Sequence, residues 1–196
     1  GIFGSRVQPD ISTKSGLSDV AYHENQGFDF KDDNKPLKTS FTDYRTWIVH
    51  GEDPRDSYAF ASTAAQYVHC LKIAEGKTGE DYSSIMTDYQ TAAENAYTWA
   101  SNNTRSGDEN KKHFIENRAA AASWLYKITG NQPYLDQLKA DLLAKNISSS
   151  TNNLGESKWA VWAYATIDDT NPLYTGTFDA QLKADLIRAI EKDAHR

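Results

Sequence analysis

The sequence predicts an all-α fold built from antiparallel helical hairpins, and three observations lead to this prediction. From Asp53 onward, apolar residues recur at helical spacing in six separate stretches. The phrase QLKADL occurs twice, at residues 137–142 and 181–186. Stretches rich in alanine and aromatic residues alternate with stretches that carry charge on one side. A helix that is apolar all round is buried, so the chain is predicted to alternate inner and outer helices.

The first two predicted helices form one hairpin. Asp53 is an N-cap, Pro54 suits the first helical position, and Gly76 marks the end of this helix. The helix contains Cys70 within its apolar pattern, which predicts a buried and unreactive thiol. The second helix is predicted over about residues 83–100.

The other four predicted helices form two further hairpins. They cover about residues 110–129, 133–146 and 156–167, and the last helix runs from a Thr177 cap to the end of the chain. Residues on the apolar faces of these helices and of the first helix are expected in the core. They are Phe60, Ala64, Val68, Leu71, Ala121, Trp124, Leu125, Val161 and Tyr164.

Residues 1–53 read as an irregular, loop-rich segment that enters a helical domain of residues 54–196. Glycine and proline interrupt this segment repeatedly, and only the stretch YRTWIVHGEDP could be a short strand or an extended loop. Two architectures fit the helices, an open solenoid and a closed α/α toroid. Small alanine residues let inner helices approach closely, which favours the toroid.

Composition excludes several classes of protein. The net charge is −6 with no basic run, so nucleic acid is not an expected partner. No stretch approaches the roughly 18 apolar residues of a membrane span. A single cysteine excludes a disulfide framework, and the histidines lack metal-ligand spacing. The KDDN stretch at residues 31–34 lacks the rest of a calcium-binding loop, so we expect neither a metal nor a cofactor.

Four stretches resemble, in order and spacing, the second half of a glycoside hydrolase family nine catalytic domain. They are DPRDSYAFASTAAQYVHCLKIA, AAENAYTWA, ENRAAAASWLYKITGNQPYLDQL and WAVWAYATID, and the resemblance covers about residues 44–170. The chain departs from the family pattern at Trp124, where the family has glutamate, and at PRDS, where the family has a PKST-like turn.

The resemblance implies an (α/α)6 barrel that hydrolyses β-glucan such as cellulose with inversion. Such a barrel has twelve helices, so the six predicted here are about half of it. The family uses an aspartate in a DAGD loop and a glutamate near the domain end, and this chain matches neither. The catalytic carboxylates are therefore expected outside the chain, which alone should be inactive. The resemblance also implies an extracellular or periplasmic protein, bound to the rest of its parent chain or to a second copy.

Sugar binding is the expected role of residues just ahead of the first inner helix. Sugar rings stack on aromatic side chains and need polar partners, and this stretch supplies Tyr44, Arg45, Trp47 and His50. His50 lies where the family's substrate contacts fall. Trp159 and Trp162 share a helix face. We expect their rings to pack in the core more readily than to stack on a ligand.

An inverting glycosidase holds two carboxyl groups about 6.5–9.5 Å apart, and no pair here has a spacing that demands this chemistry. Asp53 reads as a helix cap, and Glu116 and Glu156 read as first-turn residues that suit the helix dipole. Glu52 and Asp56 are the other candidates. Two alternatives therefore stay open: a non-catalytic helical-repeat binding module, and an α/α-toroid enzyme of another class, such as a lyase.

Overall fold

The computed structural model describes residues 53–195, except 169, 172 and 177, together with the backbone of two short strands nearer the N-terminus. The chain divides into two compact units, Gly4–Gly51 and Gly1–Phe3 with Glu52–Arg196. In the first unit, strands β1 (Val7–Pro9) and β2 (Trp47–Val49) pair antiparallel with Val7 opposite Val49. Strand β2 lies in the stretch for which the sequence allowed a strand or an extended loop.

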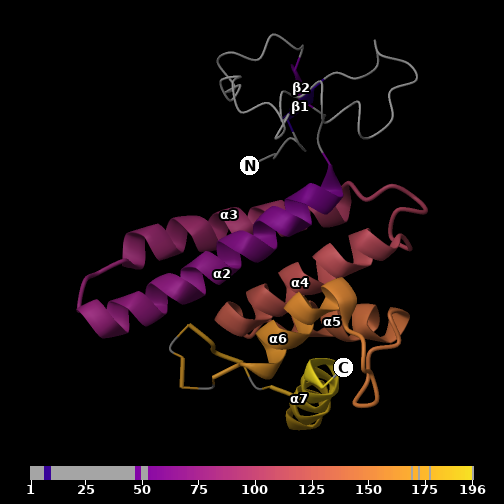
Figure 1. The fold of residues 1–196 in the computed structure, drawn as a ribbon. Helices are drawn as coiled ribbons and strands as arrows, with labels where there is room; N and C mark the ends of the chain where they lie inside the picture. Colours follow the sequence, from indigo (N-terminus) through magenta and orange to yellow (C-terminus); the bar gives the residue numbers. More distant parts are fainter. Residues whose placement is uncertain are drawn as a thin grey trace, which may run out of the picture. The chain divides into compact units, whose positions relative to one another are not determined.

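Six α-helices make up the described part of the second unit (Figure 1). They confirm the all-α prediction for that part of the chain. The elements in order are α2 (Pro54–Thr78), α3 (Ser83–Asn102), α4 (Lys112–Thr129), α5 (Gln132–Ala144), the 3₁₀ turn η1 (Gly155–Ser157), α6 (Lys158–Ala165) and α7 (Ala180–Ala194). None of them is long and apolar enough to cross a membrane.

The helices form three hairpins whose first members pack on one another. Helix α2 packs against α3 and α4, α4 also packs against α5 and α6, and α6 packs against α7. Helices α2, α4 and α6 therefore form an inner row, and α3, α5 and α7 each flank one member of it (Figure 1). This is the alternation that the sequence predicts.

Helix α4 is the centre of the unit, and its composition explains why. Four consecutive alanines, Ala119–Ala122, are all buried, and the small side chains let α2 and α6 approach from either side. The hydroxyl of Ser123 donates to the carbonyl oxygen of Ala160 over 2.7 Å, which joins α4 to α6. Every residue from Ala119 to Thr129 is buried, so this part of α4 is covered on all sides.

The predicted start of the first helix is confirmed, and its predicted end is wrong. The carboxylate of Asp53 accepts a hydrogen bond from the Arg55 backbone N–H over 2.8 Å, as an N-cap should. The helix passes through Gly76 and ends at Thr78, and the next residue, Gly79, has a φ of 74°, the left-handed conformation of a C-cap. Helix α7 is capped by Asp179, which accepts from Leu182 N, and not by the predicted Thr177, which lies outside the described residues.

Helix α4 ends at Gly130, as predicted, and two backbones meet there. Gly130 has a φ of 72°, and a Cβ atom added to it would lie 2.1 Å from the backbone nitrogen of Gly176. The neighbouring Thr175 hydroxyl donates to the Thr129 carbonyl oxygen over 2.7 Å. The loop before α7 is thus fixed against the turn between α4 and α5.

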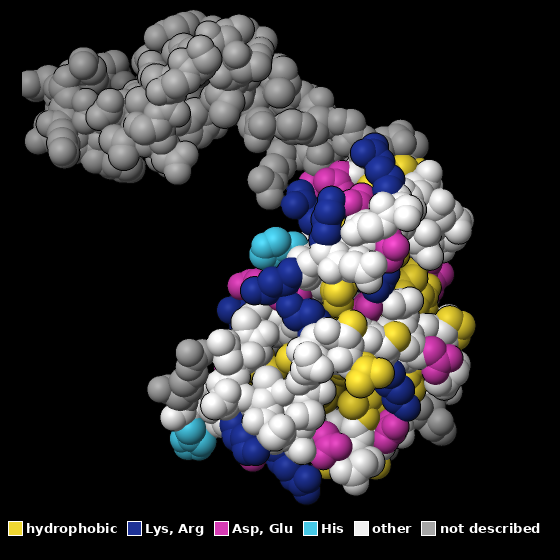
Figure 2. Space-filling model, turned by 90° about the vertical axis from the view of Figure 1, so that its right-hand side faces the viewer, with side chains coloured by type: hydrophobic (Ala, Val, Ile, Leu, Met, Phe, Trp, Pro, Cys, Tyr) yellow, Lys and Arg dark blue, Asp and Glu magenta, His cyan; other side chains and the backbone are white. Residues whose placement is uncertain are grey.

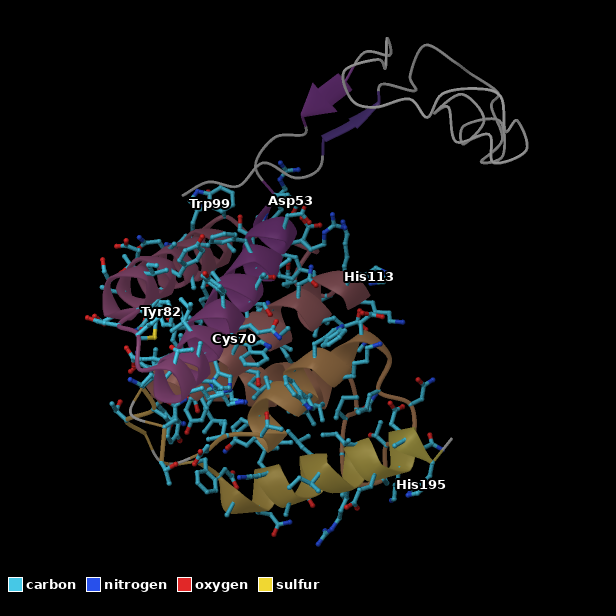
Figure 3. All side chains as sticks on the ribbon, turned by 60° about the vertical axis from the view of Figure 1, so that its left-hand side comes forward. Asp53, Cys70, Tyr82, Trp99, His113 and His195 are labelled. Carbon is cyan, nitrogen blue, oxygen red and sulfur yellow. The ribbon has the colours of Figure 1, made fainter. Side chains whose placement is uncertain are left out.

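The core prediction is confirmed at eight of the nine positions, and Phe60 is the half-buried exception. The expectation for Cys70 is wrong, because this thiol is exposed. Figure 3 shows Cys70 part-way along α2. Its apolar neighbours in the sequence face α3 and α4, whereas Cys70 lies on the side of α2 that neither helix covers.

Candidate functional site: a tryptophan groove over helix α4

A groove runs over α4 between the two other inner helices. Its floor is Asn117, Ala120 and Trp124, which the helical repeat places on one face of α4. One wall is a face of α2, and the other wall is Trp159 of α6; the hollow that they enclose measures about 280 Å³. The residues of the α2 wall are Ala59, Ser62, Thr63 and Gln66.

A second hollow of about 310 Å³ adjoins the first and shares Gln66 and Trp159 with it. It adds Trp162 from α6 and reaches α7. Its other lining residues are Leu154, Lys158, Ile190 and Asp193. The two hollows together are called the tryptophan groove below. Each is close to the lower limit of about 300 Å³ that is usual for small-molecule pockets.

The two tryptophans of α6 are exposed, so the expectation that they pack in the core is wrong. Trp159 is 53% exposed and Trp162 is 46% exposed. They do share one helix face, as their spacing indicates. Helix α6 buries its opposite face, including Val161 and Tyr164, against α4 and α7, which leaves both indole rings at the groove. Large aromatic rings held open to solvent are a feature of binding surfaces.

Neighbouring groups fix the orientation of both rings. The indole nitrogen of Trp159 donates to a carboxylate oxygen of Glu156 over 3.3 Å, so Glu156 acts as a ring support. The ring centroid of Trp162 lies 5.7 Å from that of buried Trp124. Asn117 donates to the backbone oxygen of Arg55 over 3.3 Å, which also fixes the floor of the groove.

A buried lysine lies beneath the Trp162 ring. The Lys127 side chain nitrogen donates to the Thr166 hydroxyl over 2.7 Å, and it lies 4.9 Å from the Trp124 ring centroid and 5.5 Å from that of Trp162. Lys127 is only 2% exposed and has no carboxylate within ion-pair distance in the described part of the chain. Burial, with a smaller contribution from Lys183, lowers the pKa of Lys127 to about 8.

His69 on α2 completes this cluster. Its ring lies 5.7 Å from the Trp124 ring, and its Nδ1 atom is 3.4 Å from the Asn171 amide nitrogen. Burial, and then the nearby Lys127 charge, lower the pKa of His69 to about 4. The histidine is therefore neutral at physiological pH, and Lys127 carries the positive charge of the cluster.

A different hollow, of about 410 Å³, lies where α2 and α4 begin, and charged residues dominate it. Asp53, Arg55, Asp108, Lys111, Lys112 and His113 line it with Phe114. Figure 2 looks onto this end of the helices and shows basic side chains interspersed with acidic ones. Asp53 and His113 mark the starts of α2 and α4 in Figure 3.

Two carboxylates near this charged hollow, Glu116 and Asp56, are held in ion pairs. Glu116 is 4% exposed, and its two oxygens lie 2.9 Å from the Lys145 nitrogen and 3.2 Å from His113 Nδ1. It is the fifth residue of α4, so the first-turn interpretation of Glu116 is wrong. Asp56 accepts from Arg55 Nε over 3.1 Å. Each of these carboxylates thus has a structural cation beside it.

Of the substrate-binding residues predicted from sequence, Tyr44, Arg45 and His50 lie outside the described residues. Trp47 is in β2, but its side chain also lies outside the description. Glu52 and the KDDN stretch lie outside it as well. Among the described residues, no group of three or more His, Cys, Asp and Glu side chains could hold a metal ion.

No protein-family model matches the chain, and neither a curated protein nor a solved structure is significantly similar to it. The tryptophan groove is therefore the basis for the proposed function. Sequence reasoning found Trp159 and Trp162 but assigned them to the core. Their spacing of three residues on a short helix that ends the inner row is the signal that could have located the groove.

Proposed function

We propose that the chain is part of a glycoside hydrolase that resembles family nine and acts on a β-glucan such as cellulose. Its contribution is to bind the polysaccharide in the tryptophan groove. The observation that carries this proposal is the pair of half-exposed indole rings, Trp159 and Trp162, beside the amide groups of Gln66 and Asn117. Sugar rings present flat C–H faces to aromatic rings and hydroxyl groups to amides.

The hydrolytic carboxylates come from outside the described residues in this proposal. Asp193 is the one carboxylate that lines the tryptophan groove among those residues, and it accepts a hydrogen bond from Leu154 N over 3.0 Å. An inverting mechanism needs two carboxyl groups that face each other across a water. The groove therefore binds and orients sugar, and the bond is broken elsewhere in the enzyme.

The three hairpins are half of an α/α toroid in this proposal, and the rest of the parent chain or a second copy supplies the other half. Apolar side chains exposed on the first and last hairpins support this. They include Tyr67 and Tyr89 at one end and Ile187 at the other, each between 39% and 41% exposed. Burying such residues against further hairpins would stabilise the unit. Such an enzyme works outside the cytoplasm, where its polymer is.

Affinity electrophoresis through a gel that contains hydroxyethyl cellulose tests the groove. We expect Trp159→Ala to weaken retention by up to about tenfold, because one aromatic stacking contact contributes about 0.5–1.5 kcal/mol. Tyr89→Ala is the matched control, since Tyr89 is 41% exposed and lies on α3, away from the groove. Equal retention of the two variants would overturn the proposed binding site.

Hydrolysis assays with carboxymethyl cellulose test the other half of the proposal. The chain alone should give no measurable turnover, because removing a general acid or base typically costs about 10²–10⁴ in rate. Turnover by the purified chain would place an active centre within it.

A non-catalytic binding module is the second candidate, and one observation favours it. Both indole rings and both amides of the groove belong to this chain, and the described residues that line it include no facing pair of carboxylates. A parent protein that binds cellulose derivatives but never hydrolyses them would establish this alternative.

A further inference from the structure

A hollow on the outer side of the helical unit lies between the last turns of α3 and the turn that joins α4 to α5. It measures about 390 Å³, within the usual range of small-molecule pockets. It is lined by Tyr97, Thr98, Ser101, Asn102, Asn131, Gln132, Pro133 and Tyr134. We call it the outer hollow. It shares no lining residue with the tryptophan groove.

None of the residues that line the outer hollow carries a charge. This is unusual in a chain in which 24% of residues are charged, and it contrasts with the charged hollow at the starts of α2 and α4. The lining instead combines three amides, two aliphatic hydroxyls and two tyrosines. An ionic ligand would find no counter-charge among these residues, and an apolar ligand would leave the amides without partners.

Several polar groups of the outer hollow are available to a ligand. Asn131 is the N-cap residue of α5 but makes no side-chain cap bond. Among the described residues, neither the Asn131 amide nor the Asn102 amide has a hydrogen-bond partner in the protein. Gln132 donates from its nitrogen to Asp136 over 2.8 Å, which leaves its carbonyl oxygen as an acceptor. Each amide offers both a donor and an acceptor.

The two tyrosines form a rigid corner at the hollow. Their ring centroids lie 5.0 Å apart with the planes at 85°, so one ring meets the other edge to face. The Tyr134 hydroxyl is protonated at neutral pH and able to donate, and burial raises its pKa further, to about 12. A flat ring with a neutral hydroxyl suits the alternating C–H and O–H groups of a sugar.

We propose that the outer hollow is a second saccharide-binding site, which takes a neutral oligosaccharide and is separate from the tryptophan groove. Uncharged amides, hydroxyls and aromatic rings together match a ligand that has many hydroxyl groups and no charge. The site stands on its own residues, so it does not depend on the function proposed for the groove. On a polymer, it would hold the outer side of the protein to a second stretch of sugar.

Titration of the ¹⁵N-labelled chain with cellotetraose, followed by NMR, separates the two sites. We expect the side-chain amides of Asn102 and Asn131 to shift at millimolar sugar, independently of the indole N–H signals of Trp159. Shifts in the groove alone would overturn the second site and leave the proposed function standing. Shifts in the outer hollow alone would support the second site and overturn the binding role proposed for the tryptophan groove. The chain should be made in the bacterial cytoplasm, because Asn102 begins an Asn-Asn-Thr glycosylation sequon.

Two variants sharpen this test. Asn131→Ala should weaken binding at the outer hollow at least threefold and leave binding at the groove unchanged. Asn152→Ala is the matched control, an exposed loop asparagine that lines neither site. Because Asn131 makes no capping bond, the variant should fold normally, which circular dichroism verifies. Equal affinities of the two variants would overturn the proposal. If the outer hollow bound trigalacturonate, an anionic oligosaccharide, more tightly than neutral cellotetraose, the proposed preference for a neutral ligand would be overturned.

Discussion

The phrase QLKADL forms part of two helices, α5 at residues 137–142 and α7 at residues 181–186, and its side chains differ in environment. In both copies the glutamine donates to the aspartate four residues later, over 3.0 Å in α5 and 3.1 Å in α7. The aspartates then diverge. Asp141 is 1% exposed and accepts two guanidinium nitrogens of Arg118, whereas Asp185 pairs on the surface with Arg188 of its own helix.

The difference comes from the inner helix on which each copy packs. Helix α5 packs on α4, which presents Arg118 to it, and α7 packs on α6, which has no arginine. Burial raises the pKa of the Asp141 carboxyl above its usual range, and Arg118 opposes that shift. The six residues therefore form the same local hydrogen bond in both helices. The inner helix on which each copy packs determines whether its aspartate is buried in an ion pair.

The largest effect should come from removing the aspartate charge in each copy. Asp141→Asn leaves the partly buried Arg118 guanidinium without its carboxylate, which should lower the free energy of unfolding by about 3–5 kcal/mol. Asp185→Asn removes one exposed ion pair and should cost only a few tenths of a kcal/mol. Urea denaturation measures both. If the two substitutions lowered the free energy of unfolding by similar amounts, the partly buried Arg118 guanidinium would not need the Asp141 carboxylate as its counter-charge.

The leucine that follows each glutamine gives the next comparison. Leu138 is fully buried, so Leu138→Ala should lower the free energy of unfolding by about 3 kcal/mol. Leu182 is half-buried, and Leu182→Ala should cost about 1 kcal/mol. Thermal and urea unfolding of the two variants, against the unchanged chain, give the difference. A larger loss at Leu182 would show that α7 is covered by more than α6.

The smallest difference between the two copies should come from their lysines, which differ in their effect on the pKa of buried Lys127. The folded-state pKa of Lys127 is about 8, below the unfolded value of about 10.4, so the folded chain releases this proton more readily. The free energy of unfolding should therefore rise between about pH 8 and pH 10.4, by at most about 3 kcal/mol. Below pH 8, where Lys127 is charged in both states, this cost of burial is present in full.

Lys183 contributes to that shift, and Lys139, its equivalent in α5, does not. Lys183→Gln should raise the pKa of Lys127 and flatten the pH dependence by a fraction of a kcal/mol. Lys139→Gln, which removes an exposed pair with Asp179, is the control and should leave the slope unchanged. Urea denaturation at several pH values between 7 and 10.5 measures the slopes. A steeper slope in Lys183→Gln would contradict the assigned cause.

Helix positions could be predicted because their signals are local. Asp53 followed by proline, and Gly130 after an apolar run, each identify a helix end from one or two residues. Gly76 was misleading because an exposed helix interior tolerates glycine, and the left-handed cap falls instead at Gly79. The N-cap of α7 is Asp179 and not the predicted Thr177, because the Asp179 carboxylate accepts a hydrogen bond from the N–H of Leu182.

The spacing of Trp159 and Trp162 indicates one side of the groove, but its other lining residues could not be predicted, because they come from separate helices that meet only in the folded chain. Periodicity assigned Cys70 and Trp162 to apolar faces, yet both side chains are exposed, because periodicity cannot show which face another helix covers. Neither α3 nor α4 covers the side of α2 that carries Cys70, and α6 is too short to enclose its tryptophans. The buried pair of Arg118 and Asp141 was likewise invisible, since 23 residues separate its members.

The contact between Gly130 and Gly176 has a consequence for how this sequence can diverge. The two residues are 46 positions apart, yet a Cβ atom on either would lie within 2.4 Å of the other's backbone. No side chain fits at either position while the backbones keep this approach, so the two glycines must be inherited as a pair. If the last hairpin were replaced by the corresponding hairpin of a related sequence, the two backbones could keep this contact only if the new hairpin also had glycine at position 176.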